Sequence, residues 1–311
     1  MTDHSEFVQR SYRSHEGAYD AYTRDGSKAA LAAAWLQPGT VNGWRMGRMY
    51  QLAAPLLDTF PGAQWLTVGD GRYGLDAAYL ATHGARALAT DISGTLLGEA
   101  KQAGLISDYR VENAEALSFD DNAFDFVLCK ESYHHFPRPM MALYEMLRVA
   151  RRGVLLIEPC DHEIPDTPVT AASRWLKNLA KRLLGRPVHG HRFEELGNYV
   201  YGISRRELSK VALGAGFPTV AFKGINDAYF PRVEFERAEP ASAVFRRVRR
   251  QIARYDRLCA LGINQFGLLG AVILRQAPEP ALRAALLRQG FEVVDLPARP
   301  TSAQPDDGAL G

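Results

Sequence analysis

The chain has 311 residues, of which 47% are hydrophobic and 23% charged, as is usual for globular proteins. Its net charge of +2 provides no overall attraction to nucleic acid or membranes, and three separate cysteines without a C-x-x-C pair argue against a disulfide framework or a zinc site. The polar N-terminus resembles no signal segment and no apolar run approaches the roughly 20 residues of a membrane helix, so we expect a cytoplasmic protein.

The first sixty residues carry helical patterns. We expect two helices that include the alanine-rich run 28–36, a break at Pro38-Gly39, and a third helix over 43–60. Packing against a sheet is the favoured role for most of the aromatic residues here. The functional alternative is a lid over a ligand, with Arg45 or Arg48 facing a carboxylate or phosphate.

A strand, a glycine turn, a helix and a second strand follow in order. Residues 64–68 form an apolar run, and the turn Gly69-Asp70-Gly71-Arg72-Tyr73-Gly74 comes directly after it. Glycine at 69 and 71 lets the backbone approach a ligand closely, and the helix that begins near Gly74 would direct free N–H groups at a negative part of that ligand.

The second strand ends at Asp91, whose carboxylate can accept hydrogen bonds from both hydroxyls of a ribose. This unit alone fits a dinucleotide site and a site for another adenosine cofactor equally well. An ordinary turn without a ligand is less favoured because all four parts occur in order.

The next hundred residues alternate between strand and helix patterns. The expected strands are 64–68, 86–90, 107–111, 125–129 and 153–157, and the expected helices are about 74–83, 95–103 and 138–150. This alternation predicts an α/β fold, a doubly wound, Rossmann-like and mostly parallel sheet preceded by N-terminal helices.

Two insertions interrupt the second half of the chain. The first carries a basic helix at 173–184 and a His-Gly-His turn at 188–191, and the second carries an arginine-rich helix at 244–257. A solvated face is slightly favoured for those arginines over a phosphate-binding surface. Nucleic acid is not expected as a partner, because aromatic residues are not interleaved with the basic ones.

We therefore divide the chain into five parts. They are a helical lid at 1–60, a ligand-binding core at 61–160, an insertion on the acceptor side at 161–203, the remainder of the core at 204–275 with its insertion at 224–266, and a tail at 276–311 that is disordered from about residue 298. Within the remainder of the core, we expect a helix at 204–214 and strands at 218–223 and 268–274.

Several motifs of the core, taken together, carry a family resemblance. They are the glycine turn, Asp91, the segment Asn113-Ala114-Glu115-Ala116-Leu117-Ser118-Phe119, the strand Phe124-Asp125-Phe126-Val127, the run His134-His135-Phe136 and the strand that ends in Glu158-Pro159. Over residues 60–160, the chain resembles the class I S-adenosylmethionine (SAM) dependent methyltransferases.

The resemblance implies SAM as the cofactor and assigns residues to it. These cofactor-binding residues are Gly69, Asp70, Gly71, Asp91, Ile92, Asn113, Ala114, Glu115 and Lys130. It implies that Gly69 and Gly71 approach the methionyl part, that Asp91 binds the ribose and that residues 113–115 lie at the adenine. The chain departs from the family at Thr67, where an acid is usual, and at Asn113, where Asp is common.

The resemblance also implies an acceptor pocket over the ends of the fourth and fifth strands. The candidate catalytic residues there are His134, His135 and Glu131, and the candidate substrate-binding residues are Tyr133, Glu158, Asp161, His162 and Arg45. His134 is the first choice of general base and His135 the second, because an imidazole titrates near neutrality. Glu131, Asp161 and His162 could instead bind a divalent metal, but solvated loop acids are favoured and we expect no metal site.

We expect methyl transfer to a small molecule, most simply to a hydroxyl of a sugar or glycan precursor. A softer resemblance to polysaccharide and O-antigen biosynthesis methyltransferases rests on residues 194–207. An NAD(P)-dependent oxidoreductase is disfavoured by residues 113–119 and by the His-His-Phe run. A silent SAM-binding scaffold protein stays open because of Thr67 and Asn113, and the oligomeric state is open as well.

Overall fold

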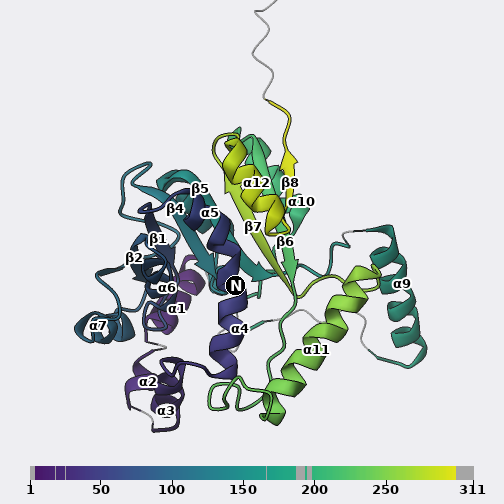
Figure 1. Cartoon of the computed structure of the whole chain (residues 1–311), viewed down its shortest axis with the longest axis horizontal. Helices are drawn as coiled ribbons and strands as arrows, with labels where there is room; N and C mark the ends of the chain where they lie inside the picture. The colour runs from purple at the N-terminus through teal and green to yellow at the C-terminus, as the bar shows by residue number, and fades with distance from the viewer. Residues whose placement is uncertain are drawn as a thin grey trace, which may run out of the picture.

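The computed structural model of the protein describes residues 4–17, 19–24, 26–165, 167–186, 193–194 and 198–298 (Figure 1). Two expectations lie outside these residues: the His-Gly-His turn at 188–191 and the disorder of the tail beyond residue 298.

An eight-stranded sheet forms the centre, with the strand order β3-β2-β1-β4-β5-β7-β6-β8. The strands are β1 Gln64–Val68, β2 Arg86–Asp91, β3 Tyr109–Val111, β4 Phe124–Lys130, β5 Ala150–Pro159, β6 Thr219–Ile225, β7 Leu268–Leu274 and β8 Glu292–Asp295. Strands β1 to β5 pair in parallel, whereas β7 is antiparallel to its two neighbours and β8 is antiparallel to β6. The mostly parallel α/β sheet is confirmed, with β8 as an edge strand that the pattern did not predict.

Helices cover both faces of the sheet. They are α1 His4–Glu16, α2 Asp20–Arg24, α3 Gly26–Trp35, α4 Val41–Tyr50, α5 Ala54–Thr59, α6 Leu75–Thr82, α7 Thr95–Gln102, α8 Pro139–Val149, α9 Pro168–Leu183, α10 Arg205–Ala215, α11 Ala243–Ala260 and α12 Pro280–Arg288, with short 3-10 turns at η1 Gln51–Ala53 and η2 Tyr133–His135. The single helix expected over 43–60 is divided by η1, because Pro55 has no N–H with which to continue the α-helical hydrogen bonding of α4.

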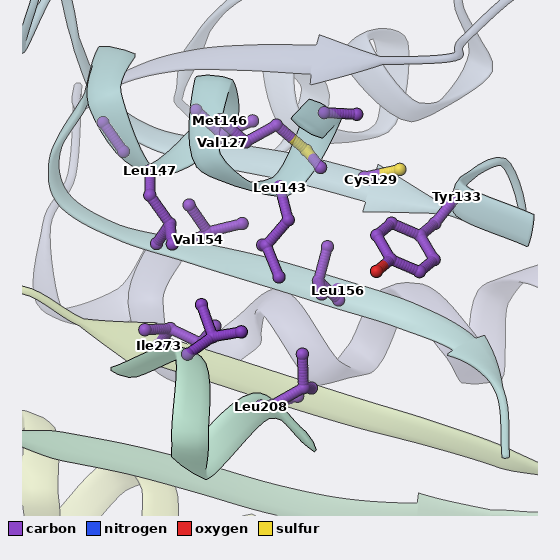
Figure 2. Close-up of a cluster of buried hydrophobic side chains, with 14 of the residues drawn as sticks. Val127, Cys129, Tyr133, Leu143, Met146, Leu147, Val154, Leu156, Leu208 and Ile273 are labelled. Atoms are coloured by element: carbon purple, nitrogen blue, oxygen red, sulfur yellow. The ribbon is translucent and has the colours of Figure 1, made fainter. Parts of the chain in front are cut away.

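The apolar residues of the strands alternate between two cores. On one face, Val127, Val154 and Leu156 pack with α8 and α10, as the purple side chains of Figure 2 show. On the other face, Trp65 and Phe126 pack with the N-terminal helices and α12. This alternation follows from the two-residue period of a strand. It fixes the sheet between two helical layers and leaves the carboxyl ends of β1, β2 and β4 to line a site.

The two insertions lie beside one another at one side of the molecule (Figure 1). Helix α11 packs on α4, where the rings of Trp44 and Phe245 meet edge to face with centroids 5.1 Å apart. Helix α9 lies farther from the sheet (Figure 1), and its first turn touches the loop that follows α11, where Val169 adjoins Gly262. None of the helices in the described part of the chain combines the length and apolarity that crossing a membrane requires.

Candidate active site

A cavity of about 450 Å³ opens where β1, β2 and β4 end. In parallel sheets, ligands bind at this edge, and the volume falls in the roughly 300–1,000 Å³ range of small-molecule sites. Its wall includes the following sequence-predicted residues: Gly69, Asp70, Asp91, Ile92, Asn113, Ala114, Glu115, Lys130, Glu131 and His135. The structure therefore brings together residues that are up to 66 positions apart in the sequence (69 to 135).

The glycines of the turn are required by close contacts. Gly69 has φ +76°, and a Cβ there would lie 2.3 Å from the Cβ of Ser132. A Cβ on Gly71 would lie 2.3 Å from the ring of Tyr19 and 2.8 Å from the carboxylate of Asp91. No side chain larger than hydrogen fits at either position without displacing the wall of the cavity.

Asp70 stabilises the glycine turn by hydrogen bonds of its own side chain. Its carboxylate accepts hydrogen bonds from the N–H groups of Asp76 (3.1 Å) and Ala77 (2.9 Å) and from the hydroxyl of Thr67 (2.8 Å). Burial, together with the neighbouring charge of Asp76, raises the pKa of Asp70 well above its ordinary value. The expectation that the first turn of this helix offers free N–H groups to a ligand is wrong, because Asp70 occupies them.

A second buried carboxylate, that of Asp76, lines the same end of the cavity. It accepts a hydrogen bond from the Tyr50 hydroxyl (2.7 Å) and pairs with the Lys130 ammonium (3.2 Å). Burial alone would lower the pKa of Lys130, but the charges of Asp76 and Glu131 outweigh it and the pKa is raised. This end of the cavity therefore presents a positive and a negative group side by side.

Asp91 lies at the end of β2 and faces the cavity. Its Oδ1 accepts a hydrogen bond from the N–H of Ser93 at 2.8 Å. Burial raises the pKa of Asp91 to about 6, against the opposing effect of the N–H groups of Ser93, Gly71 and Ile92. A carboxylate in this state gains from further hydrogen-bond donors, such as hydroxyl groups of a ligand.

Glu115 ties the N-terminal helix to the core. Its buried carboxylate accepts hydrogen bonds from the backbone N–H of Arg138 (2.7 Å), from the Arg138 guanidinium (2.6 Å) and from the Tyr12 hydroxyl (2.5 Å). The neighbouring Asn113 accepts a hydrogen bond from the Glu115 N–H at 2.9 Å, so its side chain shapes the same loop.

Aromatic residues from the N-terminal segment form another part of the wall, although packing against the sheet was the expected role of most of them. Tyr22 contacts Tyr19 and Trp35, with ring centroids 5.8 Å and 5.0 Å away. All three, together with Tyr12, line the cavity. The signal that could have found them is the spacing of the tyrosines ahead of the glycine turn.

Three ionisable side chains meet where η2, α1 and the first insertion approach one another. His135 Nδ1 hydrogen bonds with the Glu194 carboxylate, whose other oxygen lies 3.5 Å from His15 Nε2. All three residues line the cavity. The pKa of Glu194 is lowered, because its hydrogen bond with His135 and the charges of the histidines outweigh the opposing effect of burial.

This cluster has the composition of a metal site as well as of a proton-transfer site. Its ligand atoms lie within 4.8 Å of one another, and His15 Nδ1 is held at 2.9 Å from the Ser11 carbonyl, which leaves Nε2 facing the cluster. His15 and Glu194 were not among the sequence-predicted site residues, since only the fold brings these distant positions to His135.

His134 lies next to this cluster, with its ring centroid 4.1 Å from that of His135, but it has a different partner. Its Nδ1 lies 2.7 Å from Glu158, a fully buried carboxylate that also accepts the N–H groups of Ser132 (2.8 Å) and Tyr133 (3.0 Å). Burial alone would lower the pKa of His134, but the hydrogen bond and charge of Glu158 outweigh it, so the pKa is raised. Glu158 thus holds η2 in place and occupies the Nδ1 edge of the His134 ring.

The turn before η2 is conformationally strained. Glu131 has φ +51°, a left-handed backbone that residues other than glycine rarely adopt, and its carboxyl side chain lines the cavity. Such strain persists where the surrounding structure enforces it and is concentrated at functional sites. The backbone N–H of Glu131 donates to the Ile157 carbonyl at 2.9 Å, which ties this turn to β5.

Comparison with known proteins identifies the domain. Residues 66–157 match the family model described as a methyltransferase domain. The chain carries a class I SAM-dependent methyltransferase domain. SAM is therefore the cofactor of this domain, and the oxidoreductase alternative is not supported.

Solved structures that are similar to the chain have low sequence identity to it. The (4+2)-cyclase SpnF is 19% identical, with a TM-score of 0.52, and the alignment covers 86% of this chain and 97% of SpnF. Magnesium protoporphyrin IX methyltransferase from Synechocystis PCC 6803 is 15% identical (88% and 100% covered, TM-score 0.45), and a SAM-dependent methyltransferase from Methanosarcina mazei is 18% identical (72% and 98%, TM-score 0.43). No curated protein matches the chain. These likenesses concern the fold and do not identify an acceptor.

Other predicted substrate-binding residues lie away from the cavity of the methyltransferase domain. Tyr133 is buried in the hydrophobic core beside Cys129 and Leu156 (Figure 2), so the expectation that it contacts an acceptor is not met. Arg45 is also buried, and its guanidinium is bound by the Asp227 carboxylate, with Nε at 2.9 Å from Oδ1, and by Asn42 Oδ1 at 3.2 Å.

Asp161 and His162 are also separate from the methyltransferase cavity. Asp161 accepts a hydrogen bond from the N–H of Glu163 at 2.7 Å, and His162 lines a second cavity between α9 and α11. The residues of the disfavoured metal alternative, Glu131, Asp161 and His162, are therefore divided between two places.

Proposed function

We propose that the protein transfers a methyl group from SAM to a hydroxyl of a sugar or glycan precursor, with His135 as the general base. The observation that carries the proposal is the His135–Glu194 pair in the wall of the cofactor cavity. A hydroxyl must lose its proton during methylation, whereas a neutral amine can be methylated before it loses one. An imidazole that is hydrogen bonded to a carboxylate is suited to removing the proton of a hydroxyl.

The cavity has the groups that the two ends of SAM need. Asp91 would accept hydrogen bonds from the ribose hydroxyls, and Ile92, Asn113 and Ala114 would flank the adenine. At the other end, the amino-acid part of SAM carries one positive and one negative charge. The paired Asp76 and Lys130 offer the complementary charges, 3.2 Å apart. We propose that Asp76 replaces the acid that is usual at the position of Thr67.

Asp70 and Glu115 were predicted to bind the cofactor, but both are hydrogen bonded within the protein, and we assign them positioning roles. Asp70 holds the first turn of α6, and Glu115 holds α1 against the loop that would contact the adenine. Gly69 and Gly71 would keep the backbone clear for the methionyl part. The N-terminal helices would then act as a lid that contributes Tyr12, Tyr19 and Tyr22 to the site.

The chemistry divides between the cofactor and the protein. When bound, SAM supplies a methyl group on a sulfonium and leaves as a neutral thioether. The protein aligns the acceptor oxygen, an effect that can supply roughly 7–11 kcal/mol through proximity. His135 takes the hydroxyl proton on Nε2, and Glu194 at Nδ1 stabilises the imidazolium that forms. Glu131 would accept a hydrogen bond from another hydroxyl of the acceptor.

The test is methyl-labelled SAM with a panel of nucleotide sugars and glycans and a host extract, read by mass spectrometry. With the acceptor identified, we expect His135→Gln and Glu194→Gln to bind SAM as the parent does in calorimetry and to lower kcat by about 100-fold, since general base catalysis contributes roughly 10²–10⁴-fold. His83→Gln, on an exposed helix end, is the control.

Three outcomes would contradict the base assignment. Parental turnover of His135→Gln together with a large loss in His134→Gln would return the role to His134. Loss of activity on chelation with EDTA, restored by a divalent metal, would assign the cluster of His15, His135 and Glu194 to metal binding. Tight SAM binding without methyl transfer to any acceptor would favour the silent scaffold.

A further inference from the structure

Helix α9 displays its apolar face to solvent. The helical spacing of Ala172, Leu176, Leu179 and Leu183 places these residues on one side, which begins at Val169 where the helix meets Gly262. The exposed fractions are 59% for Leu176 and 79% for Leu183, and Trp175 at the edge of this face is 63% exposed. A surface helix normally buries such a stripe, so the exposed apolar face of α9 is a candidate interaction surface.

The polar side of α9 faces the body of the protein instead. Thr170 is its buried residue, the Arg174 guanidinium donates to the His162 carbonyl at 2.8 Å, and the Lys177 ammonium donates to Asn264 Oδ1 at 2.6 Å. These contacts fix the rotation of the helix about its axis. The outward direction of the leucines therefore follows from bonds made on the opposite face.

The charged side chains of α9 and its ends have one sign. Residues 167–186 contain five basic side chains and no Asp or Glu. Two of the five, Arg174 and Lys177, are bound on the polar side of the helix. Lys181, Arg182 and Arg186 are exposed. A helix with an exposed apolar stripe, a tryptophan at the edge of that stripe and only basic charged residues has the composition of a helix that lies in a membrane interface.

We propose that α9 docks this protein on an anionic lipid surface, with its apolar face inserted among the headgroups and its basic residues on lipid phosphates. The charge distribution favours this occupant over a second copy of the chain. A symmetric contact through α9 would bring two positively charged faces together, whereas an anionic bilayer complements them. The proposal does not depend on the identity of the methyl acceptor.

The test is co-sedimentation of the full-length protein with vesicles of phosphatidylcholine alone or with one third phosphatidylglycerol. We expect binding to the anionic vesicles that weakens as salt is raised. The triple variant Trp175→Ser/Leu176→Ser/Leu183→Ser should bind at least tenfold more weakly. Lys181→Gln/Arg182→Gln/Arg186→Gln should lose about fivefold for each basic residue removed.

The matched control is Met141→Ser/Tyr144→Ser on α8, which removes exposed apolar side chains from another helix and should bind as the parent does. Calorimetry with SAM and circular dichroism verify that each variant is folded. Equal binding by the parent and the apolar variant, or no binding to anionic vesicles, would overturn the proposal. So would a dimer, measured by light scattering without lipid, that the apolar variant abolishes.

Discussion

The cavity wall around Asp91 and the contact between α4 and the segment after β6 both hold buried charge, but the charges are satisfied differently. Asp91 accepts a backbone hydrogen bond from Ser93, and its pKa is raised to about 6 by burial. Arg45 has a carboxylate, that of Asp227, along one edge of its guanidinium and Asn42 on another nitrogen. The Asp91 carboxylate can therefore accept further hydrogen bonds from a ligand, whereas the Arg45 guanidinium already has its partners within the protein.

The largest expected effect is on cofactor binding through Asp91. Asp91→Ala removes the acceptor for two ribose hydroxyls, and hydrogen bonds to a charged group contribute roughly 1.5–3 kcal/mol each. We expect SAM to bind at least about 100-fold more weakly in calorimetry, with the thermal stability of the protein little changed. Asp108→Ala, which removes an exposed carboxylate that pairs with Lys101, should bind SAM as the parent does.

If Asp91→Ala bound SAM with unchanged affinity, the cavity wall at Asp91 would not differ from the Arg45–Asp227 contact in its capacity to bind a ligand. That result would also remove the main support for the placement of the ribose at the end of β2.

The second largest effect is expected from Arg45→Met, which should lower the stability of the fold without changing SAM binding. Arg45→Met leaves the Asp227 carboxylate without its partner in a mostly buried position, where side-chain exposures are 6% and 15% for the two residues. We expect the free energy of unfolding to fall by about 2 kcal/mol in urea denaturation. The affinity for SAM should stay within threefold of the parental value.

The double variant Arg45→Met/Asp227→Leu sharpens this test. Replacing both partners with apolar groups removes the unpaired charge, so much of the lost stability should return. If Arg45→Met instead keeps its stability and loses methyl transfer to the identified acceptor, Arg45 binds substrate and the sequence-based expectation was right.

The sequence located Asp91 at the cavity but did not locate Arg45 correctly, and this difference has a physical reason. Asp91 belongs to a local unit in which strand, turn and helix lie within 30 residues, and parallel pairing fixes where the second strand ends. The position of β1, β2 and β4 and the sites of Gly69, Lys130 and Glu131 follow from the same local patterns. The edge strand β8, with only four residues, gave no such signal.

Arg45 depends instead on a partner 182 positions away, as His135 depends on Glu194, 59 positions away. Periodicity reports which face of an element is apolar, but not which loop will cover a charged residue on it. For the same reason, the arginine pattern of α11 and the amphipathic pattern of α9 look alike in sequence. In the fold, α11 buries Phe245, Val248 and Ile252, whereas α9 turns its leucines outward.

The smallest expected effect is the pH dependence of SAM binding. Ribose hydroxyls donate to the ionised form of Asp91, and below a pKa of about 6 that form becomes the minority. Between pH 7 and pH 5 we expect the affinity to fall by about tenfold, one decade for each pH unit below the pKa. Asp91→Asn should bind more weakly at pH 7 and lose most of this dependence.

The unliganded protein should respond to the same titration in the opposite direction. Because the folded-state pKa of Asp91 lies above its unfolded value, the protonated carboxyl contributes stability that is fully present below about pH 3.8 and is lost as pH rises through about 6. Relative to Asp91→Asn, the parent should therefore gain stability toward low pH while it loses affinity for SAM. If both quantities moved together, the carboxylate would have a complete partner inside the protein, as Arg45 has, and the contrast between the two regions would be wrong.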